Sequence, residues 1–330
     1  MWNFSLLQIV LIGAGFILLA DLAIHLIYAI VALNRFESRP PFRVQPPGLH
    51  APLPEPLSLL TQDRLRLQGG IYLPEDAPLQ GVVIFCPETA GPAETATNYA
   101  QALLDSGFAV VSFNFRNQAP SESRPGYRSS FWLTENELRD VHAVLDVVHT
   151  QPQFQGLPVG LMGVSRGGAA ALAAAADRCD VDAVWAQGAF SNHGLATHHV
   201  NYFIEAVVGR WGRFIPRWHV AVTIECMLQI AQWRYGARFI RLENALPQLC
   251  GRPVQFVSGK KDMYVPPRLT RQLQALIGDA KQPACWEVAG AKHNTERLVA
   301  RDEYDQRIVE FFQQIVRTSP LRQQTVSLTH

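Results

Sequence analysis

The chain has 330 residues, a length that suits one or two globular domains. Lys and Arg number 29 and Asp and Glu 28, so the formal net charge of +1 cannot supply the field that sequence-independent nucleic-acid binding needs, and we expect no nucleic-acid partner. Hydrophobic residues make up 48% and charged residues only 17%, which predicts that part of the chain lies in lipid. The five cysteines are scattered without a Cys-x-x-Cys pair, which argues against a disulfide framework and favours a reducing compartment.

The chain begins with a long apolar segment, residues 4–33. About 20 apolar residues cross the roughly 30 Å hydrocarbon layer as a helix, so we predict a transmembrane anchor over residues 1–35. No Lys or Arg precedes the segment and the apolar run is longer than that of a signal peptide, so we expect the anchor to be retained. Arg35, Arg39 and Arg43 follow it, which predicts a single-pass topology with the rest of the chain on the cytoplasmic side.

Two polar residues interrupt this segment. Asp21 and His25 lie four positions apart and therefore share one face of a helix. A charge at mid-bilayer costs about 2.5–3.5 kcal/mol on insertion scales, so both side chains should not face lipid. Either they pair with each other or mark the end of a shorter span, or they form a helix contact or a proton-sensitive pair, which in an oligomeric pore would support transport.

A proline-rich stretch over residues 36–56 blocks helix formation and predicts an extended, semi-rigid tether. Beyond it, residues 57–330 alternate short apolar runs with helix-like runs. This alternation predicts an α/β domain with a mainly parallel twisted sheet and helices on both faces. The expected strands are residues 82–86, 109–115, 159–164, 181–185, 254–258 and 284–288, preceded by an antiparallel hairpin of residues 57–60 and 65–72.

Helices are expected between these strands. Thr134 and Glu137 form a capping-box start for a helix with apolar residues at helical spacing up to Val148. Another helix should end at Gly278, because glycine is the usual residue just after a helix. Residues 190–249 are too many for a simple connection between two strands, so we predict an inserted helical cap there.

The strongest chemical signal is a serine between small residues, Gly163-Val164-Ser165-Arg166-Gly167. It follows an apolar strand and opens an alanine-rich helix, which is the context that a nucleophile elbow requires. The glycines leave room where a side chain would collide with the neighbouring backbone. We therefore predict that Ser165 is a nucleophile and that the backbone N–H of Arg166 stabilises the developing oxyanion.

A serine nucleophile needs a base and an acid that orients the base. Asp262 comes just beyond the expected strand 254–258, and His293 just beyond the expected strand 284–288. The order Ser, Asp, His along the chain is the one found in hydrolases that carry such an elbow. We therefore predict a triad of Ser165, His293 and Asp262.

From about residue 57 to its last helix, the chain resembles the α/β-hydrolase superfamily, particularly its esterase, lysophospholipase and serine-aminopeptidase-like branches. The resemblance implies the α/β-hydrolase fold, a serine mechanism and no cofactor. In such families the loop after the third strand usually reads His-Gly and supplies the second oxyanion N–H. This chain has Cys86-Pro87-Glu88 there, so the Glu88 N–H is expected to donate, with its carboxylate pointing away from the oxyanion.

The expected cap is rich in residues that suggest two further roles. Its histidines lack Asp, Glu or Cys at ligand spacing, so we predict polar surface there and no metal site. Its tryptophans are interleaved with arginines, which suits either a membrane interface or ordinary packing of a lid. These residues are His193, His198, His199 and His219, then Trp211, Trp218 and Trp233, and Arg210, Arg213, Arg217 and Arg234.

Taken together, the sequence predicts a membrane-anchored serine hydrolase that cleaves an acyl ester through an acyl-enzyme. The expected partners are a small-molecule acyl substrate, with lipid esters as one option, and the membrane itself. The alternative is an inactive hydrolase fold that serves as a binding or scaffold protein at the membrane, because the His-Gly of the oxyanion loop is missing. The sequence leaves the oligomeric state open.

Overall fold

The computed structural model describes residues 5–38, 44, 46, 52–278 and 284–318. It divides into two compact units. The anchor unit comprises Met1–Pro41 and His193–Arg234, and the sheet unit comprises Phe42–Asn192 and Tyr235–His330. Most of the expected tether, residues 36–56, lies outside the described residues.

The sheet unit is built on an eight-stranded sheet in the order β1-β2-β4-β3-β5-β6-β7-β8. β1 pairs with β2 and β2 with β4 in antiparallel fashion, and the other pairs are parallel, as predicted. The predicted strands all form, with ends shifted by a few residues. They are β1 Glu55–Leu60, β2 Arg66–Tyr72, β3 Gly81–Cys86, β4 Phe108–Phe113, β5 Val159–Val164, β6 Ala183–Gln187, β7 Val254–Gly259 and β8 Trp286–Val288.

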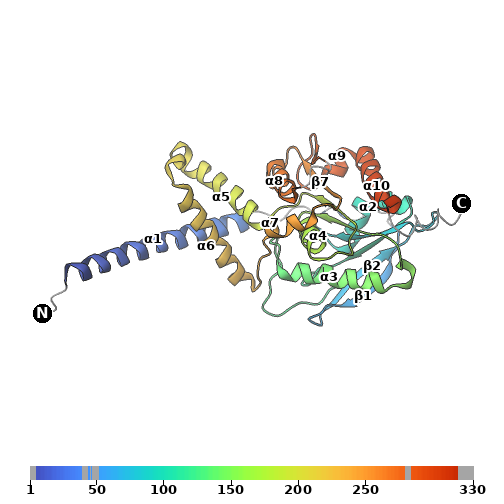
Figure 1. Cartoon of the computed structure of the whole chain (residues 1–330), viewed down its shortest axis with the longest axis horizontal. Coiled ribbons are helices and arrows are strands. Elements are labelled where there is room, and N and C mark those ends of the chain that lie inside the picture. The colour runs from blue at the N-terminus through green and yellow to red at the C-terminus, as the bar shows by residue number, and fades with distance from the viewer. Residues whose placement is uncertain (1–4, 39–43, 45, 47–51, 279–283, 319–330) are drawn as a thin grey trace. The chain divides into compact units, whose positions relative to one another are not determined.

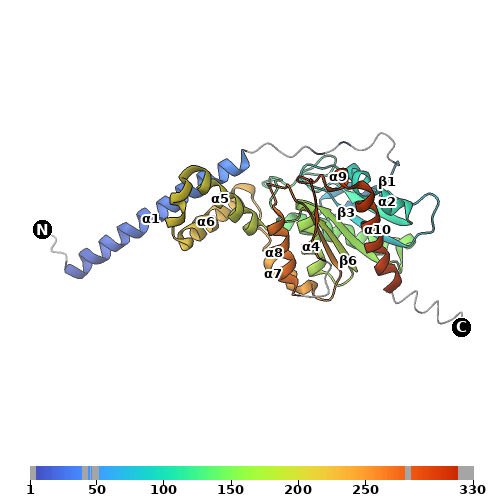
Figure 2. The ribbon, with the colours of Figure 1, turned by 90° about the horizontal axis from the view of Figure 1, so that it is seen from above.

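Helices cover both faces of the sheet (Figures 1 and 2). Successive side chains of a strand point to opposite faces, so Ile84 of β3 packs into one apolar core and its neighbour Val83 into the other. The first core contains residues of α3 (Glu135–Thr150), α4 (Arg166–Asp177) and α8 (Pro267–Ile277). The second contains residues of α2 (Thr97–Asp105) and α10 (Arg301–Thr318). This arrangement is the predicted doubly covered α/β fold.

Local signals set the helix ends as expected. The Thr134 side chain caps the start of α3, and the Glu137 side chain returns a hydrogen bond to the Thr134 backbone, which completes the capping box. At the end of α8, Gly278 takes a left-handed conformation with φ 72°, which glycine adopts without strain.

The anchor unit consists mainly of α1 (Leu6–Glu37), α5 (Asn192–Val208) and α6 (Arg217–Tyr235), with a 3-10 turn at Gly209–Phe214 between the last two. α1 packs through one face in its carboxyl-terminal half, where Phe36 contacts His199 of α5 and Glu37 pairs with Arg234 of α6 at 2.6 Å. The buried residues of this face are His25, Ala29, Ala32, Leu33 and Phe36.

The amino-terminal half of α1 exposes its large apolar side chains, from Leu6 at 78% to Leu19 at 67%. Exposed apolar patches of this extent are rare on soluble monomers. Among the described helices, α1 alone is long and apolar enough to cross a membrane by length and composition.

The stretch expected to form a cap, residues 190–249, divides between the two units. Its helices α5 and α6 belong to the anchor unit, except for Asn192 at the start of α5 and Tyr235 at the end of α6, which belong to the sheet unit. Residues of α7 (Leu242–Ala245) and of the following turn Leu246–Leu249 instead pack into the first core of the sheet unit.

Candidate active site

Ser165 lies on the sharp turn between β5 and α4, with φ 55° and ψ −119°. A residue other than glycine rarely adopts positive φ, so the turn is strained and must be held by its surroundings. Two glycines make it possible. A Cβ on Gly163 would lie 2.3 Å from the carbonyl oxygen of Gly167, and a Cβ on Gly167 would lie 2.0 Å from that of Cys86. The small residues of the motif are thus required by backbone packing.

The structure brings together the three residues that the sequence predicts as a triad. The Ser165 Oγ lies 3.0 Å from His293 Nε2, and His293 Nδ1 lies 2.6 Å from Asp262 Oδ2. Ser165 follows β5, Asp262 follows β7 and His293 follows β8, so the parallel strands deliver all three to one edge of the sheet. All three side chains are buried or nearly so.

Asp262 is itself fixed, because its Oδ1 accepts hydrogen bonds from the backbone N–H groups of Tyr264 and Val265, both at 2.8 Å. Its other oxygen remains for His293. Burial of His293 is the largest single influence and disfavours the charged ring, but the charge and hydrogen bond of Asp262, together with the charges of Glu296 and Glu88, raise the pKa of His293 above its usual value. The histidine is therefore poised to accept a proton from Ser165 and to hold the resulting charge beside Asp262.

Gly188 makes room for the histidine ring. It follows β6 with φ 57°, and a Cβ there would lie 3.2 Å from both His293 Cε1 and Asn294 Oδ1. We expect Gly188→Ala to lower kcat by about 10-fold, because the added Cβ displaces the His293 ring by a few tenths of an ångström and a misplacement of about 1 Å costs about 100-fold. The check is the hydrolysis rate of the purified variant, with its melting temperature measured alongside.

Gly278→Ala is the matched control for that variant. Gly278 also has positive φ, 72°, but no atom of the described residues lies within 4 Å of its Cβ position. Both substitutions should destabilise the protein by about 1–2 kcal/mol through backbone strain, whereas only Gly188→Ala should slow catalysis. Equal kcat values for the two variants would show that Gly188 does not position His293.

The residues predicted as oxyanion donors also lie at this edge. Arg166 is the first residue of α4, where backbone N–H groups have no partner within the helix. The loop that carries Glu88 follows β3, whose Cys86 pairs in register with Gly163 of β5. The close approach of Gly167 to the carbonyl oxygen of Cys86 holds this loop against the elbow.

The Glu88 side chain is buried, and its Oε1 accepts a hydrogen bond from the Tyr99 hydroxyl at 3.3 Å. Burial raises the pKa of Glu88 above the usual range, although Tyr99 and His293 act in the opposite direction. Burial thus favours the neutral acid, and a neutral carboxyl group does not repel a developing oxyanion. The electrostatic conflict that the sequence suggests at this position is reduced.

A buried acid beside His293 is absent from the sequence-based prediction. Glu296 is fully buried, and its Oε2 accepts a hydrogen bond from Gln187 Nε2 at 2.6 Å, while Gln187 Oε1 accepts one from Tyr304 at 2.7 Å. Burial raises the pKa of Glu296 to about 7. The one sequence feature that could have pointed to Glu296 is its position three residues after His293. The sequence alone does not distinguish a buried acid from one on the surface.

The Arg166 side chain has a structural role distinct from that of its backbone. It is fully buried, its Nη1 donates to the carbonyl oxygen of Ser130 at 2.6 Å, and it pairs with Glu137 at 3.5 Å. Glu137 is the residue that completes the capping box of α3. The elbow is therefore tied to the start of α3 by a buried ion pair.

Comparisons with known proteins agree with this fold. Residues 77–237 match the family model described as serine aminopeptidase, S33. An esterase of Pyrococcus furiosus superposes with a TM-score of 0.59 at 16% identity, covering 84% of this chain and 97% of the esterase. The α/β-hydrolase GrgF of a Penicillium species gives a TM-score of 0.61 at 15% identity, covering 80% and 99%.

A curated relative matches a smaller region. It is a protein of Mycobacterium tuberculosis that carries the name of a phosphoribosyl transferase, 33% identical over 123 residues. The match covers 36% of this chain and 26% of the relative, so this chain spans about a quarter of that protein's length. The chain therefore has the α/β-hydrolase fold, and its residues 77–237 are similar to the serine aminopeptidase family.

Proposed function

We propose that this protein is a membrane-anchored serine hydrolase that cleaves acyl esters. The observation that carries the proposal is the continuous hydrogen-bond chain from Ser165 through His293 to Asp262, with separations of 3.0 and 2.6 Å. These are the separations that a nucleophile, its base and the orienting acid require. The esterase among the structural neighbours supports the ester as the bond that is cleaved.

In the proposed reaction the Ser165 Oγ attacks the acyl carbonyl while His293 Nε2 takes its proton. The carbonyl oxygen becomes an oxyanion, which the N–H groups of Arg166 and Glu88 would stabilise. The tetrahedral intermediate collapses as His293 gives the proton to the leaving alcohol, leaving an acyl group on Ser165. Water, activated by His293, then attacks this ester, and the carboxylic acid leaves with Ser165 restored.

Substrate screening tests the reaction type. We expect p-nitrophenyl esters to be hydrolysed faster than aminoacyl arylamides, and vesicles to increase the rate on long acyl chains, because the anchor would place the enzyme at the lipid surface. Faster cleavage of the arylamides would contradict the esterase and favour a peptidase, as the name of the matching family model suggests. If neither class is cleaved and a fluorophosphonate probe does not label the protein, the inactive scaffold is the better description.

We propose that α1 anchors the protein as a single-pass helix, with the sheet unit on the cytoplasmic side. The exposed aromatic side chains of the 3-10 turn after α5 and of the first turn of α6 support an additional contact with the membrane surface. Trp211 and Trp218 are 62% and 61% exposed, and Arg210 lies over the Trp211 ring at 5.5 Å. Aromatic rings with neighbouring cations are typical of the headgroup region.

The anchor can be tested with two charges on its exposed face. Leu11 and Leu18 are 61% and 69% exposed. The double variant Leu11→Arg/Leu18→Arg should leave the membrane fraction, because each arginine near the centre of a span costs about 2.5–3.5 kcal/mol. Leu60→Arg, at a 58% exposed position of β1, is the control. If the double variant resists carbonate extraction as the wild type does, α1 does not span the bilayer.

A further inference from the structure

Three metal-ligating side chains lie together in the anchor unit, apart from the candidate active site. Asp21 and His25 come from α1, and His219 comes from α6. Asp21 Oδ2 lies 3.5 Å from His25 Nε2, and Asp21 Oδ1 lies 3.3 Å from His219 Nε2. The ligand atoms of all three residues lie within 4.8 Å of one another. The acid that the cap histidines lack along the sequence is therefore supplied by α1.

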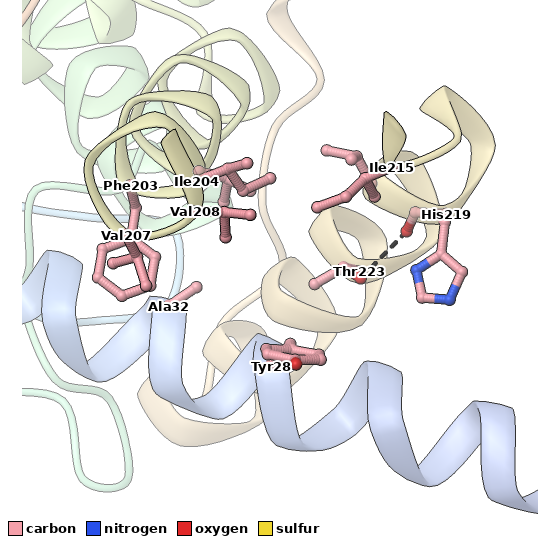
Figure 3. A pocket seen from close by; sticks show the side chains of 11 residues that line it. Tyr28, Ala32, Phe203, Ile204, Val207, Val208, Ile215, His219 and Thr223 are labelled. Carbon is pink, nitrogen blue, oxygen red and sulfur yellow. Dashed lines mark hydrogen bonds between the residues drawn. The ribbon is translucent and has the colours of Figure 1, made fainter. Parts of the chain in front are cut away.

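Thr223 fixes the protonation of His25. The Thr223 hydroxyl donates its hydrogen to the backbone carbonyl oxygen of His219 at 3.0 Å (Figure 3). Its oxygen lies 2.8 Å from His25 Nδ1 and must therefore accept a hydrogen bond from that nitrogen. With the proton on Nδ1, a neutral His25 ring presents the lone pair of Nε2. A hydrogen bond from the ring nitrogen that does not bind the metal is the usual way in which proteins orient a metal-binding histidine.

A cation would satisfy the ligand atoms of this cluster. His25 is only 2% exposed, and its Nε2 has no hydrogen-bond partner among the described residues. That nitrogen faces an Asp21 carboxylate oxygen at 3.5 Å, so with the other ring proton on Nδ1 either a metal ion or a second proton must separate the two lone pairs. A second proton would make His25 an imidazolium ion paired with Asp21, with its ring centroid only 3.9 Å from that of His219. Titration with Zn²⁺ or Co²⁺ distinguishes the two cases.

The separations suit a tetrahedral metal. Ligand atoms at about 2.0–2.2 Å from a zinc ion stand roughly 3.4 Å apart along each edge of the tetrahedron. The separations of 3.3 and 3.5 Å, which run to different oxygens of Asp21, are close to that edge, and one ligand atom from each residue lies within 4.8 Å of the other two. His219 and Thr223 also line an apolar groove of about 300 Å³ between α1, α5 and α6 (Figure 3).

We propose that Asp21, His25 and His219 bind a divalent transition-metal ion, with Zn²⁺ as the expected species. The ligands join two helices that are 198 positions apart in the sequence, so the ion would clamp α6 to the anchor helix α1. About 20 residues counted from Leu6 end near His25, so the site would lie where the span leaves the hydrocarbon layer.

The test uses the full-length protein in detergent, stripped with a chelator and then dialysed against Zn²⁺. We expect about one zinc ion per chain by elemental analysis, a higher melting temperature with zinc, and a tetrahedral absorption spectrum with Co²⁺. Asp21→Asn and His219→Ala should abolish binding. Thr223→Val, which removes the acceptor for His25 Nδ1, should weaken it by about 10–100-fold, and Thr223→Ser should restore it.

His193→Ala is the matched control, because His193 lies in the same unit and pairs with Glu225 at 3.8 Å. It should bind zinc as the wild type does. The proposal fails if the wild type retains no zinc after dialysis, or if Asp21→Asn and His219→Ala bind it with unchanged affinity. If these variants unfold, the wild-type protein alone still tests the proposal. A Co²⁺ spectrum of the wild type without tetrahedral character would also overturn the proposed site.

Discussion

Replacing Ser165 by alanine is expected to lower kcat/KM for ester hydrolysis by about 10⁴- to 10⁶-fold, because the residues of a triad act as a unit and little catalysis survives the loss of the nucleophile. Labelling by a fluorophosphonate probe should disappear as well, since the probe forms its bond with the serine Oγ. The loss should be in kcat rather than KM, because Oγ bonds to the substrate only during the reaction. Steady-state kinetics and gel-based labelling measure both effects.

Ser258→Ala provides the control for this experiment. Ser258 is a fully buried serine near the carboxyl end of β7, the strand that precedes Asp262. Its loss should leave labelling and kcat close to those of the wild type. Circular dichroism of both variants checks that the sheet unit is folded. Unchanged labelling in Ser165→Ala would remove this residue from the mechanism, and labelling absent from the wild type would favour a binding protein.

The sheet and the three residues at its edge could be predicted because their signals are local. A buried parallel strand is a short continuous apolar run, and β3 and β5 each show one, while β7 is apolar apart from Gln255 and Ser258. A residue just beyond such a run must lie at the carboxyl edge of the sheet. That reasoning places Ser165, Asp262 and His293 together from their positions relative to strands, although they are far apart in the sequence.

The division of residues 190–249 could not be predicted for a different reason. Helical periodicity shows that one face of a helix is apolar, but it does not identify what that face packs against. Leu242, Leu246 and Leu249 fill a core of the sheet unit, whereas Val200 of α5 and Thr223 of α6 line the groove beside α1. In the sequence, all of these residues are apolar or small residues at helical spacing, so the two sets cannot be distinguished there.

The same limit applies to the polar residues. Asp21 and His25 are predicted to share a helix face, and they do lie 3.5 Å apart. Their third neighbour, His219, lies 198 positions from Asp21, and no local pattern connects them. Glu296 is likewise an ordinary acidic residue in the sequence and becomes distinctive only by its burial beside His293. Contacts of this kind depend on tertiary packing.

Asp262→Asn should reduce kcat by about 10⁴-fold while leaving the fold intact, because an asparagine in place of the acid favours the wrong histidine tautomer. The pH dependence gives a second, independent readout. In the wild type the carboxylate raises the pKa of His293 above 6.5, so the activity, which needs the neutral ring, should fall as the pH drops through a value above 6.5.

Without that carboxylate the burial of His293 remains and disfavours the charged ring. The acid limb of kcat/KM should therefore move to lower pH in Asp262→Asn than in the wild type, while the maximum rate falls. Asp180→Asn is the control, since Asp180 pairs with Arg178 away from His293 and should change neither quantity. A variant with low kcat but an unmoved acid limb would mean that Asp262 supports the loop and does not act on the charge of His293.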